Sequence, residues 1–404
     1  MNNFEYYNPV RIIFGEGQIK KLSELVPEKA RVLITYGGGS AKRTGTLDEV
    51  KAALTANGAR TVFEFGGIEP NPEFTTLLKA ADMVNRERIN FILAVGGGSV
   101  IDGSKFVALV SSLTEADGTV SRDRAWAALT SYAVKVDHAV DLGAVLTIPA
   151  TGSEMNPGGV VNYSERHAKL PFRSPLAYPK FSILDPAKTL TLPEQQVMNG
   201  IADAYVHVME QYLTYPVNAK VQDAFSESLL KILIEEGPAV KQQPDNIEIR
   251  KNIMWTATMA LNGLIGAGVP QDWTTHMIGH ELTSLYGIDH ARTLTIVLPS
   301  LMRELKDSKK EKLLQYARNV WAITNPQGNM SEDEIIEAAI VETENFFKSL
   351  GLPIRLADAG LDESAISAVL KQLEEHGMVA LGEHKQNDLT VSQRILERAA
   401  DRAS

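Results

Sequence analysis

Two segments that lie far apart in the sequence carry histidines at helical spacing. Asp203 and His207 occupy positions i and i+4, and so do His276 and His280. Such positions lie on one face of an α-helix, about one turn apart, so each pair can direct two side chains at one ligand. This arrangement predicts a metal site if the two helices meet.

His290 is a further candidate ligand. Gly287 is placed to end the second helix, so His290 returns on the following segment. Three or four of these side chains can close around one ion, and a carboxylate with imidazoles suits Zn²⁺ or Fe²⁺ rather than Ca²⁺ or Mg²⁺. The alternative is a set of unrelated core histidines, but four of the eight histidines fall in these two segments.

A glycine-rich turn follows the apolar run at residues 91–95. Three glycines at 96–98 precede Ser99 and Asp102. A buried strand, glycines and a helix start form an arrangement that holds a pyrophosphate, because free N–H groups and the helix dipole face the anion. The alternative is a tight turn without a ligand, and the spacing is not that of the standard GxGxxG motif.

A second glycine turn, at residues 37–39, follows another apolar run and leads into Ser40, Lys42 and Arg43. No acid follows closely to hold ribose hydroxyls, so the turn favours NADP over NAD. A solvated basic loop is the alternative. The run at 147–156 leaves a third strand with several hydroxyls, which can bond an amide or a phosphate or simply cap a loop.

The elements that must position these motifs change in character near residue 190. Strands are predicted at 31–36, 61–65, 91–95, 144–148 and 181–184, with helices at 47–57 and 75–86. Beyond residue 193 the patterns are helical, at 193–212, 218–236, 247–267, 273–286, 310–323, 332–350, 363–376 and 391–399. We therefore expect an α/β dinucleotide-binding domain over 1–190 and a helical metal-binding domain over 191–404. A single intermixed α/β domain is the alternative.

Composition narrows the class of protein. The 404 residues are 44% hydrophobic and 22% charged, with a net charge of −10 and no cysteine. This composition is typical of a globular protein. The net negative charge argues against nucleic acid or an anionic membrane as a partner. Because the chain has no cysteine, any transition metal must be bound by histidines and carboxylates. No signal peptide or apolar run of about 18 residues is visible, so we expect a cytoplasmic protein.

These motifs together resemble the iron-containing (group III) alcohol dehydrogenase family, in its butanol dehydrogenase and NADPH-dependent aldehyde reductase branch. The resemblance extends over almost the whole chain, including the segments at 8–15, 66–72 and 263–273. It implies a dehydroquinate synthase-like fold, with a nucleotide-binding α/β domain, a helical domain and an active-site cleft between them. It also implies hydride transfer between NADP(H) and a primary alcohol/aldehyde pair, by a homodimer or larger homo-oligomer.

The resemblance also implies a role for each candidate residue. One divalent ion, iron or zinc, is held by Asp203, His207, His276 and His290. His280 and Asn156 lie near the substrate and nicotinamide. NADPH is contacted by Gly38, Ser40, Asn71, Gly97, Gly98, Ser99, Asp102, Thr147, Thr151 and Lys169, with Gly38 where NAD-dependent members carry Asp.

Two features depart from the wider family, since Glu281 follows His280 and Ala291 follows His290.

The main alternative function is a metal- and NAD-dependent cyclase of the dehydroquinate synthase type. Such an enzyme needs basic residues to bind a phosphorylated substrate, and Arg292 stands alone near the candidate ligands. A non-catalytic nucleotide sensor and a helical scaffold are further alternatives, and neither explains the metal and glycine motifs together.

Overall fold

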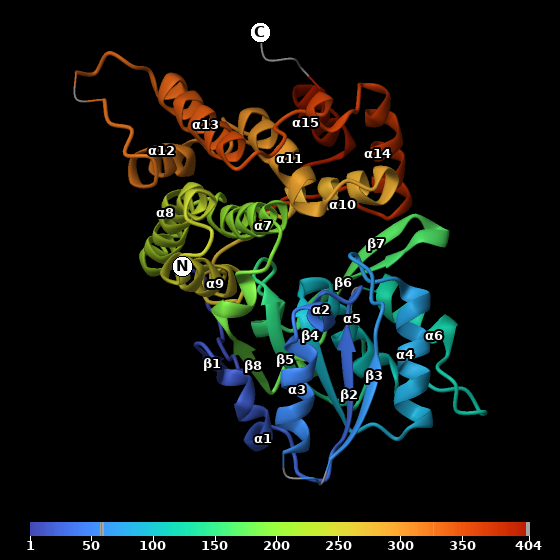
Figure 1. Cartoon of the computed structure of the whole chain (residues 1–404). Coiled ribbons are helices and arrows are strands. Elements are labelled where there is room, and N and C mark those ends of the chain that lie inside the picture. Colours follow the sequence, from blue (N-terminus) through green and yellow to red (C-terminus); the bar gives the residue numbers. More distant parts are fainter. Residues whose placement is uncertain (57, 59, 132, 326, 401–404) are drawn as a thin grey trace. The chain divides into compact units, whose positions relative to one another are not determined.

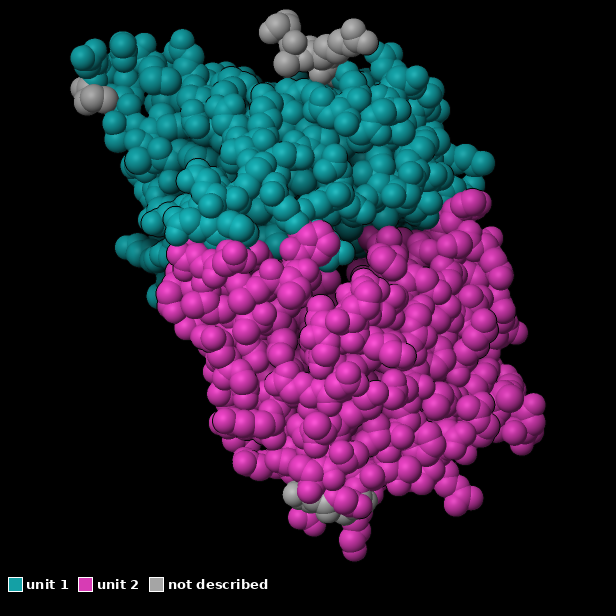
Figure 2. All heavy atoms as spheres, in the orientation of Figure 1, with its two compact units in different colours: residues 1–6, 194–244, 255–404 teal, residues 7–193, 245–254 magenta. Residues whose placement is uncertain are grey.

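The computed structural model describes residues 1–56, 58, 60–131, 133–325 and 327–400. The chain forms two compact units, coloured separately in Figure 2. Unit 1 comprises residues 1–6, 194–244 and 255–404, and unit 2 comprises residues 7–193 and 245–254. The unit that carries the glycine turns is therefore distinct from the unit that carries the candidate metal ligands.

Unit 2 is built on a six-stranded sheet of order β1-β8-β5-β4-β2-β3. All neighbouring pairs in this sheet are parallel. A separate antiparallel hairpin pairs β6 with β7. The strands are β1 Arg11–Phe14, β2 Arg31–Tyr36, β3 Thr61–Phe65, β4 Phe91–Gly97, β5 Asp141–Ile148, β6 Gly158–Tyr163, β7 Ala168–Arg173 and β8 Phe181–Leu184.

Helices cover both faces of this sheet, as the alternation of strands and helices along the sequence indicates. Ile34, Leu93 and Ile183 pack in one core with Leu22 and Val50. On the opposite face, the hydroxyls of Thr35 and Ser104 are 2.6 Å apart and join β2 to α5. The helices of unit 2 are α1 Leu22–Leu25, α2 Ser40–Arg43, α3 Thr46–Thr55, α4 Phe74–Arg86, α5 Gly98–Val110 and α6 Arg122–Thr130.

Unit 1 is helical in the part that the structure describes. Its helices are α7 Glu194–Tyr212, α8 Lys220–Gln242, the end of α9 Ile247–Ala260, α10 Thr274–Tyr286, α11 His290–Glu304, α12 Lys310–Asn319, α13 Glu332–Ser349, α14 Ser364–Glu375 and α15 Leu389–Ala400. α11 packs against α7, α10, α13 and α15 (Figure 1). None of the described helices is both long and apolar enough to cross a bilayer.

Several predicted boundaries were wrong, and α11 was not predicted. α11 contains Pro299, a residue that is uncommon in a helix interior because it lacks the backbone N–H. The helix predicted at 247–267 ends at Ala260, because Asn262 Oδ1 accepts a bond from Leu264 N at 3.0 Å and Gly263 adopts a φ of 92°. The β6–β7 hairpin and α6 were likewise not predicted.

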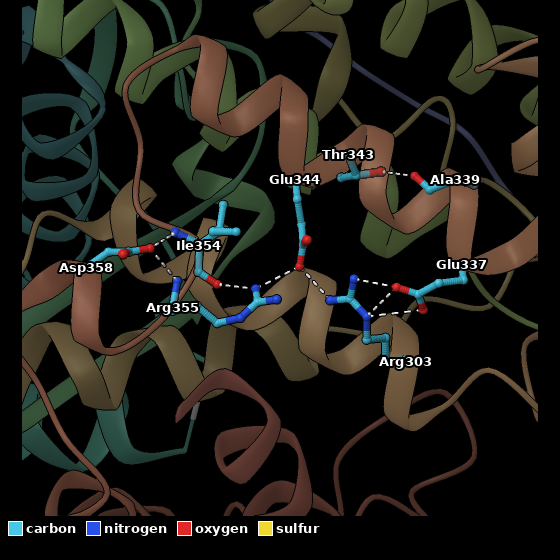
Figure 3. Close-up of polar contacts among 8 residues, drawn as sticks. All are labelled: Arg303, Glu337, Ala339, Thr343, Glu344, Ile354, Arg355 and Asp358. Carbon is cyan, nitrogen blue, oxygen red and sulfur yellow. Dashed lines mark hydrogen bonds and ion pairs between the residues drawn. The ribbon is translucent and has the colours of Figure 1, made fainter. Parts of the chain in front are cut away.

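A network of ion pairs joins α11 to α13 and to the segment that follows α13 (Figure 3). The Glu344 carboxylate, 7% exposed, accepts from Arg303 Nη1 at 2.5 Å and from Arg355 Nη1 at 2.7 Å. Arg303 also donates to Glu337, which is 51% exposed. Burial raises the pKa of Glu344, but the two guanidinium groups outweigh it and hold the pKa below its usual value.

We predict that Glu344→Gln destabilises the protein by roughly 3 kcal/mol, because two largely buried arginines lose their shared counter-ion. Glu337→Gln is the matched control and costs less than about 1 kcal/mol, since solvent screens that pair. Thermal unfolding followed by circular dichroism compares the two. Equal shifts in melting temperature would contradict this account.

Candidate active site

The candidate ligands of unit 1 converge on one carboxylate oxygen. Oδ1 of Asp203 lies 3.7 Å from His207 Nδ1, 3.7 Å from His276 Nε2 and 3.9 Å from His290 Nε2. Ligand atoms of Asp203, His276 and His290 all lie within 4.8 Å of one another, and His207 lies outside that group. Donors around a tetrahedral Zn²⁺ are about 3.3 Å apart, so small side-chain movements would close this set.

Local structure explains why these side chains meet. Asp203 and His207 share one face of α7, in a part of the helix that is buried on all sides, and His276 lies in the first turn of α10. Gly287 ends α10 with a φ of 68°, as predicted, and His290 begins α11. The left-handed turn thus brings the chain back toward the ligands, as the spacing of glycine and histidine predicted.

The donor set fits a divalent cation. Among the described residues, His207 Nδ1 and His276 Nε2 are buried without a hydrogen bond. Burial lowers the pKa of His207 to about 4, against the opposing charge of Asp203, so this imidazole is neutral at pH 7 and has a lone pair to offer. Two buried ring nitrogens beside a carboxylate are costly unless something binds them, and an ion does so.

His280 lies beside this group. Its side chain is buried, and its ring centroid is 4.9 Å from that of His290 and 6.0 Å from that of His276. The next residue, Glu281, contacts His376 Nδ1 at 2.8 Å. His280 therefore flanks the ligands, as expected, and its role toward substrate stays a prediction.

Sequence reasoning missed Glu210, a buried acid on α7 whose carboxylate contacts the ring and the backbone of His276. Its position, seven residues after Asp203, was the available signal, since i and i+7 share a helix face. The periodicity alone does not separate an acid that contacts a ligand from one that faces solvent.

In unit 2, three turns lie at one edge of the sheet. Strands β2, β4 and β5 are parallel neighbours, with Tyr36 beside Val95 and Gly97 beside Ile148. Their carboxyl ends therefore bring together the two glycine turns and the segment that contains Thr147 and Thr151. Ligands of parallel sheets bind beyond such an edge.

The first glycine turn permits a close approach of backbone to ligand. A Cβ on Gly97 would lie 2.9 Å from Ile148, and one on Gly98 would lie 2.4 Å from Thr151. Ser99 Oγ accepts a bond from Asn71 N at 3.3 Å, and Asn71 has a φ of 67°. These contacts place Asn71 beside the start of α5, where N–H groups face an anion.

The second glycine turn leads into the short helix α2. Gly39 has a φ of 99°, and Ser40 is the first residue of α2. No described atom lies within 4 Å of a Cβ built on Gly38. Packing therefore does not require glycine at this position, and a larger side chain fits there.

Asp102 and Asn156 belong to one buried network. Asp102 accepts from Ser153 Oγ at 2.5 Å and from Val160 N at 2.9 Å. Lys105 donates to Ser153 Oγ at 2.8 Å and to Asn156 Oδ1 at 3.2 Å. Burial lowers the pKa of Lys105 to about 8, although Asp102 favours its charged form. Contacts of Asp102 and Asn156 with a cofactor, and of the buried Lys169 on β7, stay predictions.

Comparison with known proteins decides the family. A model of the iron-containing alcohol dehydrogenases matches residues 9–186, and a model of the C-terminal part of this family matches residues 197–390. The chain belongs to the iron-containing alcohol dehydrogenase family. The resemblance seen in the sequence is thereby confirmed.

Individual relatives cover the chain from end to end. It is 53% identical over 399 residues to the NADPH-dependent aldehyde reductase YqhD of Escherichia coli, covering 99% of this chain and 100% of that protein. A crystal structure of E. coli YqhD has a TM-score of 0.94, with 52% identity over 98% of this chain and 99% of that chain. The NADH-dependent butanol dehydrogenase A of Thermotoga maritima has a TM-score of 0.90, at 31% identity over 99% of each chain.

We predict that Gly98→Ala weakens binding of NADPH about tenfold or more, because the added Cβ collides with Thr151 and displaces the turn. Gly237→Ala in α8 is the control, since its Cβ would come no closer than 3.1 Å to a neighbouring side chain, against 2.4 Å at Gly98. Fluorescence titration with NADPH measures both variants. Wild-type affinity in Gly98→Ala would count against a cofactor at this turn.

Proposed function

We propose that this protein is a metal-dependent alcohol dehydrogenase and aldehyde reductase, which transfers hydride between NADPH and an aldehyde to give a primary alcohol. The observation that carries the proposal is the convergence of three imidazoles on the carboxylate oxygen Oδ1 of Asp203. Membership of the family and 53% identity to an NADPH-dependent aldehyde reductase support it. The dehydroquinate synthase-type cyclase has no observation in its favour.

In this proposal Asp203, His207, His276 and His290 hold one divalent ion, iron or zinc. When bound, such an ion acts as a Lewis acid toward a carbonyl oxygen. The protein's own part is to direct the imidazole nitrogens at one point, in a largely buried site where charge interactions are strong. His280 flanks this point and is proposed, with Asn156, to contact the substrate and the nicotinamide.

The cofactor is proposed to lie along the carboxyl edge of the sheet of unit 2. Gly97, Gly98 and Ser99 would hold its pyrophosphate with N–H groups at the start of α5, which has a positive helix dipole. Asn71, Asp102, Thr147, Thr151 and Lys169 complete the proposed contacts. Gly38 and Ser40 would face the 2′-phosphate, where an acid would repel it.

The same proposal assigns residues 1–190 to dinucleotide binding and residues 191–404 to metal binding. It places the protein in the cytoplasm as a homodimer or larger homo-oligomer. Analytical ultracentrifugation of the purified protein measures the assembly directly.

Exchange of one residue tests the assignment of the cofactor. We predict that Gly38→Asp lowers the ratio of kcat/KM for NADPH over NADH about tenfold or more, since the new carboxylate repels a 2′-phosphate and accepts bonds from ribose hydroxyls. The matched control is Gly38→Ala, which adds a side chain without charge. An unchanged ratio in Gly38→Asp would place the 2′-phosphate elsewhere.

Removal of the metal tests the reaction. We expect turnover of an aliphatic aldehyde with NADPH to be lost after chelation and restored by Zn²⁺ or Fe²⁺, with NADP⁺ released in proportion to alcohol formed. Asp203→Ala should lose bound metal and turnover together, whereas Asp223→Asn, which removes a carboxylate paired with Lys312, should keep both. Full activity without metal, or in Asp203→Ala, would overturn the proposed site.

A further inference from the structure

We propose that Glu210 is a positioning residue of the metal site, which fixes the orientation and the tautomer of His276 so that Nε2 is directed at the ion. The inference rests on the proposed function, because it concerns a ligand of that site. It adds a residue from outside the four ligands and assigns it a role in metal affinity.

Contacts on both sides of the His276 ring carry this proposal. Glu210 is 4% exposed and lies on α7. Its Oε1 accepts a bond from His276 N at 3.0 Å, and its Oε2 lies against His276 Nδ1. The opposite ring nitrogen, Nε2, is 3.7 Å from Asp203 Oδ1. Glu210 thus contacts both the backbone N–H of His276 and the ring nitrogen Nδ1, and the other ring nitrogen, Nε2, faces the candidate ligands.

The chemistry of the contact selects the tautomer. An ionised carboxylate has no proton to donate, so Nδ1 must carry the hydrogen that it shares with Glu210. In the neutral imidazole Nε2 is then the nitrogen with a lone pair, which is the form that binds a metal. Ligating histidines commonly donate their other N–H to a carboxylate in this way, and loss of such a partner weakens metal binding about 10- to 100-fold.

The start of α10 explains how a buried carboxylate is tolerated here. The first N–H groups of a helix have no partner within the helix, and His276 is the third residue of α10. Glu210 satisfies this N–H, while Asp272 Oδ1 accepts from Thr274 N at 2.9 Å. The N–H of Asp272 in turn donates to the Glu210 carbonyl at 2.9 Å. The positive end of α10 therefore stabilises the carboxylate beside the ring.

Glu210→Gln is the diagnostic variant because it keeps the size of the side chain. Its amide oxygen can accept from His276 N, but the amide nitrogen then faces Nδ1 and donates to it. This reversal favours hydrogen on Nε2, which removes the lone pair from the metal side. Glu210→Asp keeps the charge on a shorter side chain, so it should recover part of the affinity.

The control is Glu227→Gln, which alters another buried glutamate of unit 1. Glu227, 8% exposed, accepts from the Tyr212 hydroxyl at 3.0 Å, from Gln315 Nε2 at 2.7 Å and from Asn319 Nδ2 at 2.9 Å. These partners are not candidate ligands. A change that acts only through general stability should appear in both variants.

The experiment measures Zn²⁺ affinity of the metal-free full-length protein by competition with a chromophoric chelator, and the visible spectrum of the Co²⁺ form. We expect Kd for Zn²⁺ to rise about 10- to 100-fold in Glu210→Gln, with an altered Co²⁺ spectrum, a smaller rise in Glu210→Asp and no change in Glu227→Gln. Metal affinity is the readout, so the result does not depend on turnover.

The outcomes separate this inference from the proposed function. Wild-type Zn²⁺ affinity and an unchanged Co²⁺ spectrum in Glu210→Gln, while Asp203→Ala loses Zn²⁺, would overturn the role of Glu210 and leave the metal site intact. Failure of the wild-type protein to bind Zn²⁺ or Fe²⁺ would overturn both. If Glu210→Gln does not fold, wild-type affinity in Glu210→Asp together with an unchanged Co²⁺ spectrum overturns the role.

Discussion

Three imidazole nitrogens face a single carboxylate oxygen in the interior of unit 1, and this convergence constrains the surrounding helices. α7 must present Asp203 and His207 on one face, and α10 must begin near His276. α11 must begin at His290, directly after the turn at Gly287. Burying such a group of donors without a cation destabilises the fold, because no interaction then compensates for the lost hydration of the polar atoms. We therefore expect the packing of these helices to be coupled to the binding of a metal.

In unit 2 the candidate binding site is formed mainly by backbone groups at the carboxyl ends of the parallel strands, rather than by side chains. Parallel strands place their carboxyl ends at one edge, and glycines at 97 and 98 leave no room for a Cβ beside Ile148 and Thr151. The buried network of Asp102 and Lys105 stiffens the loop that follows β5. The edge thus offers N–H groups and hydroxyls in a fixed arrangement, which is what recognition of a dinucleotide needs.

Much of this could be predicted from the sequence because the signals were local. The i and i+4 spacing of Asp203 and His207 implies one helix face, and Gly287 implies the turn before His290. Glu210 could not be found in this way, since its role depends on a contact with α10 that no local pattern encodes. Lys105 was missed for the same reason, because its partners come from the loop after β5. α11 was also missed: its residues from 293 to 302 are all buried, so no polar face marks it as an amphipathic helix.

Anomalous diffraction from crystals of the metal-loaded protein, recorded at the zinc and iron absorption edges, tests the central claim most directly. The account predicts one peak per chain, bonded at about 2.0–2.2 Å to Asp203, His207, His276 and His290. A peak bonded to other residues, or an ion held without Asp203 and His276, would contradict it.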